Sequence, residues 1–141
     1  MRYLPDVNLL LALSSQDHVY YATATKWLVG IRGAPLLLCA VTESGFVRLT
    51  ASPHVGNRKM ETAIELLEDI RSLPNRESLP MDGSWLELIS PLVSRIHGHR
   101  QVTDALLLGL AIRHNAILVT LDPKIQALAG QQFKAHLLTL I

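Results

Sequence analysis

The sequence contains a single cysteine, Cys39, and this scarcity excludes two kinds of site. An internal disulfide needs two thiols, and a structural thiolate metal centre needs more than one. Cys39 lies in the apolar run 36–40, where a free thiol usually behaves as a small buried hydrophobe. The chemistry of this chain must therefore depend on other side chains.

Aromatic residues are also few, at 5%, although 49% of the chain is hydrophobic. The apolar residues are mostly aliphatic, as in the buried parallel strands of α/β proteins. No apolar stretch approaches the roughly 18 residues that a membrane span needs. Asp6 interrupts the segment in which a signal peptide would have its apolar core. We therefore expect a soluble, cytoplasmic protein.

An excess of charge of one sign is missing too, since 13 basic and 12 acidic residues leave a net charge of +1. This balance does not favour a protein that binds nucleic acid through a broad basic surface. It is compatible with an enzyme that contacts a few phosphates through metal ions. Some basic residues flank loops or helix ends and could contact RNA phosphates, but alone they define no site; these are Arg48, Arg58, Lys59 and Arg100.

The pattern of apolar residues alternates between strands and helices, without a repeat or a linker. Predicted strands cover 2–5, 36–41, 79–81, 116–121 and 135–141. Predicted helices cover 7–13, 19–31, 43–50, 57–73, 105–113 and 125–129. Parallel strands joined by crossover helices predict an α/β fold, a three-layer α/β/α sandwich with a central, mainly parallel sheet. The length of 141 residues suits one domain, 1–141.

Local signals add details to this scheme. Thr42 is a plausible N-cap for the helix that begins at Glu43, and Asn115 suits the position just after the helix 105–113. Pro91 either starts a new helix after a Ser90 cap or kinks one long helix, and the sequence leaves both open. Gly109 costs a helix about 1 kcal/mol relative to alanine, which indicates a close helix–strand approach.

Four acidic residues occupy related places in this scheme. Asp6 and Asp122 directly follow predicted strands, Glu43 comes just after another, and Asp104 opens an apolar helix. Ligands of open parallel sheets bind beyond the carboxyl ends of the strands. We therefore expect the four side chains to meet at one edge of the sheet, although each alone also fits an ordinary turn or a helix start.

Carboxylates that converge repel one another unless a cation or a proton neutralises them. A set of oxygen ligands without cysteine or paired histidine favours Mg²⁺ or Mn²⁺. Such an ion can activate water and stabilise the charge of a phosphodiester under attack. The pattern therefore predicts a hard-metal site for phosphodiester hydrolysis. Of the four acids, Asp122 is the one that we expect to contact the metal ligands and not the metal itself.

Four segments in order resemble the motifs of PIN-domain proteins, and the resemblance covers nearly the whole chain. They are 4–13 (LPDVNLLLAL), 42–49 (TESGFVRL), 103–107 (TDALL) and 119–122 (VTLD). The compact length and the closing strand are similar to the VapC toxins of prokaryotic type II toxin–antitoxin pairs. The resemblance implies a PIN-like fold and an Mg²⁺- or Mn²⁺-dependent endoribonuclease, usually a homodimer, inhibited by a cognate antitoxin.

The resemblance also implies roles for individual residues. Asp6, Glu43, Asp104 and Asp122 would form the acidic metal site, and Asn8 and Thr120 would support it by hydrogen bonding. Pro123 and Lys124 stand where many relatives carry a further acid, which leaves open whether one or two metal ions bind.

Other α/β proteins with acidic sites fit the sequence less well. A receiver domain needs paired acids after its first strand and a lysine after a late one, whereas Asp6 stands alone and no strand ends in lysine. A haloacid-dehalogenase-type phosphatase needs Asp-x-Asp, and the second position here is Asn8. A catalytically inert PIN-like binding domain is the remaining alternative, although the presence of all four acids argues against it.

Overall fold

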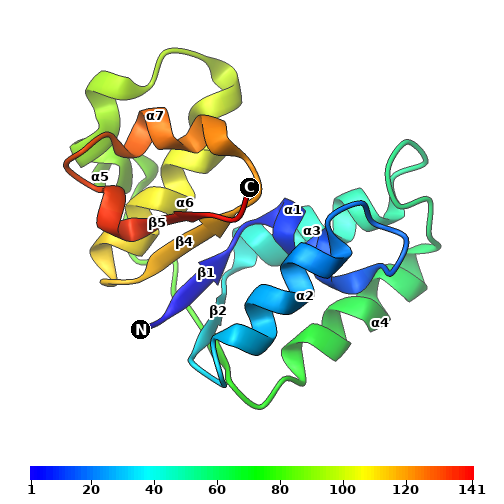
Figure 1. Ribbon diagram of the computed structural model, residues 1–141. Coiled ribbons are helices and arrows are strands. Elements are labelled where there is room, and N and C mark those ends of the chain that lie inside the picture. The colour runs from blue at the N-terminus through cyan, green and yellow to red at the C-terminus, as the bar shows by residue number, and fades with distance from the viewer.

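The computed structural model describes residues 1–141, which build a five-stranded parallel sheet between two layers of helices (Figure 1). The strands are β1 (Tyr3–Pro5), β2 (Leu36–Leu38), β3 (Arg76–Ser78), β4 (Ile117–Thr120) and β5 (Leu137–Thr139). Their order is β3-β2-β1-β4-β5, and every pair is parallel. The predicted α/β/α sandwich is therefore confirmed.

The central strands bury both faces, as the strand period of two requires. Leu4, Leu37 and Leu118 point to one layer of helices, and Leu38 and Val119 point to the other. Strands β1 and β4 pair in a register that sets Pro5 opposite Val119. The residues that follow these two strands consequently leave the sheet side by side.

One layer contains the helices of the N-terminal half, which lie to the right of the strands in Figure 1. They are α1 (Val7–Ser14), α2 (Tyr21–Gly30), α3 (Ala40–Ala51) and α4 (Met60–Arg71). Helix α1 packs against both α2 and α3, and α3 packs against α4. Two small clusters of buried residues hold this layer to the sheet.

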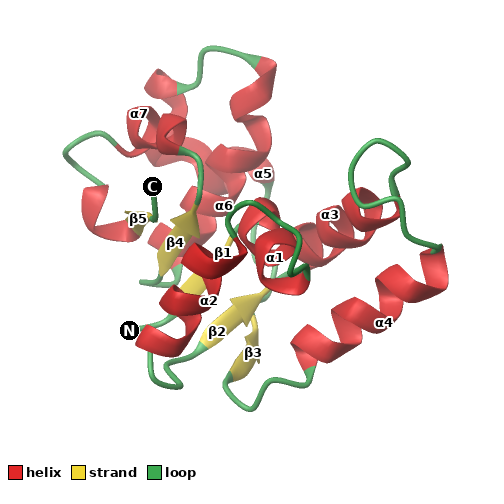
Figure 2. Cartoon of the chain, turned by 45° about the vertical axis from the view of Figure 1, so that its right-hand side comes forward, coloured by secondary structure: helices red, strands yellow, loops and turns green.

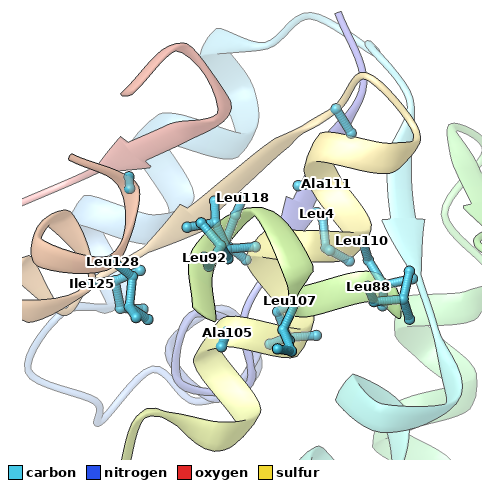
Figure 3. Close-up of a cluster of buried hydrophobic side chains, with 14 of the residues drawn as sticks. Leu4, Leu88, Leu92, Ala105, Leu107, Leu110, Ala111, Leu118, Ile125 and Leu128 are labelled. Carbon is cyan, nitrogen blue, oxygen red and sulfur yellow. The ribbon is translucent and has the colours of Figure 1, made fainter. Parts of the chain in front are cut away.

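The other layer has a single, larger core of 17 buried residues, most of which Figure 3 shows. It comprises α5 (Trp85–Ile89), α6 (Val102–Arg113), α7 (Gln126–Ala129) and 3₁₀ turns at Ser90–Arg95, His99–Gln101, Pro123–Ile125 and Lys134–His136. Leu107, Leu108 and Leu110 of α6 are almost fully buried. Helix α6 is thus the central helix of this layer, as its nearly continuous apolar sequence indicates.

Several local predictions were wrong in ways that the structure explains. Strand β2 ends at Leu38, and α3 begins at Ala40 with Cys39 as its N-cap residue. Thr42 lies inside the first turn, where its Oγ1 accepts the Cys39 amide N–H at 3.2 Å and donates to the Cys39 carbonyl at 3.1 Å. The apolar run 36–41 therefore continues from a strand into a helix, which hydrophobicity alone does not distinguish.

The predicted strand at 79–81 is also wrong, because β3 is the preceding polar segment Arg76–Ser78. It lies at the edge of the sheet and is largely exposed, so it carries no apolar signal. Gly109 approaches a helix and not a strand: a Cβ there would lie 2.3 Å from the carbonyl oxygen of Leu88 in α5. Asn115 has the predicted role, with a φ of 50° after the C-cap residue His114.

The structure also settles the two alternatives for Pro91. Helix α5 ends at Ile89 and passes into a 3₁₀ turn that contains Pro91 in its first residues. The proline therefore starts a new, tighter turn, and no long kinked helix exists. Separately, none of the helices combines the length and the apolar character that crossing a membrane would require.

Candidate metal-dependent active site

Asp6 is the most enclosed of the four acids, with 5% of its surface exposed. It follows β1 directly and caps α1, where its Oδ1 accepts the Leu9 amide N–H at 2.9 Å. Its Oδ2 accepts the hydroxyl of Thr120 at 2.5 Å. Burial raises the pKa of Asp6, the hydrogen bonds from Thr120 and Leu9 oppose this, and the charge of Asp122 adds to it.

Thr120 connects two of the acids. It is the last residue of β4 and is fully buried. Its hydroxyl donates to Asp6 Oδ2 and accepts the amide N–H of Asp122 at 2.9 Å. Because one hydroxyl binds both partners, the ends of β1 and β4 are held in a fixed relation. This is the contact through which Thr120 would support the site.

Asp122 lies two residues beyond β4, half-buried, as the N-cap residue of the 3₁₀ turn Pro123–Ile125. Its Oδ1 accepts the amide N–H of Lys124 at 2.9 Å. The other oxygen has no hydrogen-bond donor within the chain, so one oxygen remains available to a ligand.

Asp104 lies in the first turn of α6 and has the least compensated charge of the four. Neither of its oxygens accepts a hydrogen bond or pairs with a cation within the chain. Burial, and then the charges of Asp6 and Asp122, raise the pKa of Asp104 to about 6. Asp6, Asp104 and Asp122 are therefore close enough to repel one another. Asp6 and Asp122 follow β1 and β4 at the strand ends that the arrows in Figure 2 mark, and Asp104 is near enough for both charges to act on it.

Glu43 has a different environment. It lies in the first turn of α3, and its Oε2 forms an ion pair with Arg71 Nη1 of α4 at 2.6 Å. Its charge is not among those that raise the pKa of Asp6 or Asp104. The structure thus places Glu43 at the junction of α3 and α4, where Arg71 balances its charge.

Asn8 lies in the first turn of α1, two residues after Asp6. Its side chain is exposed and forms no hydrogen bond with any of the acids. It lines a cleft that runs along α1 instead. The supporting role that we expect for Asn8 is therefore not visible as a contact within the chain.

The site can be compared with the needs of a hard divalent cation. No group of three or more histidine, cysteine or acidic side chains is close enough together to hold one ion. The donor set nevertheless fits in chemistry, because Asp6, Asp104 and Asp122 offer only oxygen atoms and their repulsion is what a cation would relieve. Carboxylates that repel one another without a cation are expected to lie farther apart than when they share one.

Two contacts of the site had no counterpart in the sequence analysis. The Leu9 amide that binds Asp6 is a backbone group, and the capping position of an aspartate before a helix is the only signal for it. Arg71 lies in the predicted helix 57–73. Nothing in the sequence indicates that it reaches Glu43, 28 residues earlier.

Comparison with known proteins shows the family to which the sequence belongs. The sequence model of the family described as "PIN domain" matches residues 3–131. The chain is 38% identical over 143 residues to the protein named Ribonuclease VapC44 of Mycobacterium tuberculosis, which covers 99% of this chain and all of that protein. It is 35% identical to Ribonuclease VapC38 of the same organism, over 98% of this chain and 99% of the relative.

A solved structure is similar in fold. The crystal structure of VapBC2 from Rickettsia felis bound to a DNA fragment from their promoter contains a chain that superposes with a TM-score of 0.65. The match covers 91% of this chain and 93% of the other at 18% sequence identity. At this identity the likeness concerns the fold alone.

Proposed function

Because this chain belongs to the PIN-domain family, as a VapC-type member, we propose that it is a metal-dependent endoribonuclease and the toxin of a toxin–antitoxin pair. The observation that carries the proposal is that the charges of Asp6 and Asp122 act on Asp104 while no cation of the protein compensates them. The names of the relatives, both ribonucleases, support RNA as the substrate. An activity on RNA also agrees with the cytoplasmic location that we expect.

The metal would be Mg²⁺ or Mn²⁺, held by Asp6 and Asp104 and, in place of the indirect role expected from the sequence, by the free oxygen of Asp122. A bound ion of this kind supplies an activated water and stabilises the charge that develops on the phosphodiester. The Oε2 of Glu43 is paired with Arg71 and its Oε1 has no partner within the chain, so we propose that Glu43 joins the site as an outer, exchangeable ligand.

The residues of the chain prepare this site before any ligand binds. The Thr120 hydroxyl and the Leu9 amide hold both oxygens of Asp6 in one orientation. Asp104 keeps two oxygens without donors, so it can accept hydrogen bonds from a water molecule next to the phosphate. In the absence of a cation, Asp104 holds a proton up to about pH 6.

We also propose a cognate antitoxin and a second copy of the chain as protein partners. The support is the exposed apolar surface of two helices, with Val29 of α2 and Met60 and Ile64 of α4 exposed by 72%, 55% and 44%. Surfaces of this kind accept the apolar face of a partner helix. The structure neighbour contains VapBC2, which supports an antitoxin partner by analogy.

The proposal is tested with protein purified free of its partner and a pool of total cellular RNA. We expect cleavage with Mg²⁺ or Mn²⁺, none in EDTA, and loss of cleavage in Asp6→Asn. Asp69→Asn, which removes an exposed acid of α4, is the matched control and should keep full activity. Cleavage that persists in EDTA or in Asp6→Asn would exclude the metal mechanism. RNA binding without cleavage under all conditions would favour the inert PIN-like domain.

A further inference from the structure

A cleft of about 530 Å³ lies along α1, the helix that Asp6 caps. Asn8 lies at one end of it, two residues after Asp6, and the cleft continues along α1 past Leu11 to Ser15. Its other wall is the loop between α3 and α4. This volume is in the range of small-ligand sites, and eight of its 12 lining residues have polar side chains.

The loop that forms this wall is held firmly against α3. The amide N–H groups of Gly56 and Arg58 donate to the carbonyls of Leu49 and Thr50 at 3.1 and 3.0 Å. A Cβ on Gly56 would lie 2.3 Å from the Thr50 carbonyl oxygen, so only glycine permits this approach. The loop therefore presents Arg58 to the cleft from a fixed backbone.

Several polar side chains of the cleft have groups without a hydrogen-bond partner within the protein. Arg58 is exposed and belongs to none of the ion pairs of the protein. Thr50 is 4% exposed, and its buried Oγ1 has no hydrogen-bond partner. Nδ1 of His18 accepts the Tyr20 amide N–H at 3.0 Å, so the proton of the neutral ring lies on Nε2. Asp17 is the only acid in the lining.

We propose that this cleft binds one nucleotide of the RNA substrate beside the bond that is cut, with Arg58 pairing with its phosphate. The inference rests on the proposed function, because it assigns the substrate of the same site. A guanidinium without a carboxylate partner matches a phosphate in geometry and charge. The His18 ring N–H and the side-chain amides of the asparagines in the cleft would then donate to oxygen and nitrogen atoms of the base and the ribose.

A nucleotide explains these observations better than a peptide does. A peptide offers about as many donors as acceptors, whereas a nucleotide adds an anion and several acceptors. The cleft has one free cation and a single acid in its lining, and it starts within one helical turn of Asp6. A bound nucleotide would also supply the partner that the Thr50 hydroxyl lacks.

The first test compares Arg58→Ala with Lys59→Ala by steady-state cleavage of a single-stranded RNA oligomer in Mn²⁺. Lys59 is the adjacent residue, carries the same charge, is exposed and does not line the cleft. We expect Arg58→Ala to raise KM about tenfold with kcat within about twofold, because one charge-assisted phosphate contact is lost. Lys59→Ala should change KM less than about twofold. Equal effects of the two variants would overturn the proposal.

The second test does not depend on cleavage. Binding of the same oligomer is measured in EDTA at several salt concentrations, where each lost phosphate contact lowers the log–log salt slope by about 0.7. We expect this change for Arg58→Ala and not for Lys59→Ala. If wild type fails to cleave RNA but this difference is found, the proposed function fails and the nucleotide site stands. If wild type cleaves RNA and Arg58→Ala has the same salt slope of RNA binding as wild type, only the proposal of the nucleotide site fails.

Thr50→Val gives a third, independent readout. Valine has nearly the same shape, so removing a buried hydroxyl without a partner should keep or raise the melting temperature. RNA affinity should nevertheless fall about two- to fivefold, as for one lost hydrogen bond. Unchanged RNA affinity together with weaker binding of the antitoxin, in this variant or in Arg58→Ala, would assign the cleft to the protein partner and overturn the proposal.

Discussion

Asp104 and Glu43 each lie in the first turn of a helix that starts near the carboxyl edge of the sheet, but their surroundings are opposite. Asp104 is half-buried beside two further carboxylates and has no donor or cation. Glu43 lies against the guanidinium of Arg71. The carboxylates around Asp104 repel one another, and a bound cation would relieve this repulsion. The charge of Glu43 is already balanced by its ion pair with Arg71. The same residue class at the same kind of position thus has two different roles.

The largest expected difference between the two regions concerns activity. Asp104→Asn should lower Mn²⁺-dependent RNA cleavage by at least about a hundredfold, because it removes an uncompensated ligand next to the reacting phosphate. Glu43→Gln should lower it by about tenfold or less, because the charge of Glu43 is already balanced by Arg71. Cleavage rates at saturating metal decide this, and equal losses would remove the distinction between the two acids.

Metal binding should show the next largest difference. At a Mn²⁺ concentration about 100 times the Kd, binding to the folded state adds about 2.7 kcal/mol to the free energy of unfolding. Thermal melts with and without Mn²⁺ should show this gain in wild type, a slightly smaller one in Glu43→Gln and almost none in Asp104→Asn. A full gain in Asp104→Asn would rule out Asp104 as a ligand.

In the absence of metal, the same carboxylate should destabilise the fold. The folded-state pKa of Asp104 is raised from 3.8 to about 6, so the folded protein loses stability as the pH rises from about 4 to above 6. Asp104→Asn should therefore raise the free energy of unfolding in EDTA at pH 7.5 by about 1–2 kcal/mol, less than the full shift because the site is partly solvated.

Urea unfolding in EDTA at pH 7.5 and pH 4.5 tests this sign. At pH 4.5 the advantage of Asp104→Asn should be much smaller, since wild type is then mostly protonated at this position. Glu43→Gln serves as the control and should not stabilise the protein at either pH. A loss of stability in Asp104→Asn at pH 7.5 would show that the aspartate has a partner that the structure does not contain.

The smallest effect should come from the ion pair itself. A double-mutant cycle of Glu43→Gln and Arg71→Met should give a coupling energy of about 0.5–1 kcal/mol, because both side chains are partly exposed. Thermal or urea unfolding at moderate salt is sufficient to measure it. A coupling above about 2 kcal/mol would mean that Glu43 is anchored too strongly to exchange into a metal site.

Much of this site followed from the sequence because sheet geometry dictates it. Asp6 and Asp122 come after strands that pair in parallel, so their proximity depends only on the pairing of β1 with β4. The Asp104 position follows from the start of a helix whose apolar residues cover the same strands. Thr120, as the last residue of β4, was accessible to the same reasoning.

Other parts depend on packing that no local pattern contains. The direction of Glu43 is set by how α4 crosses α3, which brings Arg71 within 2.6 Å. Strand β3 was missed because its residues are polar and exposed at the sheet edge. The partner of Gly109 was misjudged because the short helix α5, and not a strand, lies against it. Such contacts depend on how the layers pack together, and the spacing of apolar residues along the chain does not predict them.

The Thr120–Asp6 hydrogen bond also has a consequence for the timing of synthesis. It joins residues 114 positions apart, so the site cannot exist until nearly the whole chain has left the ribosome. At about 5–20 residues per second, that interval lasts roughly 6 to 23 seconds. A nascent chain that already carries Asp6 and Glu43 therefore has no assembled site. For the proposed ribonuclease, this delay would protect the ribosome and the message that are still producing it.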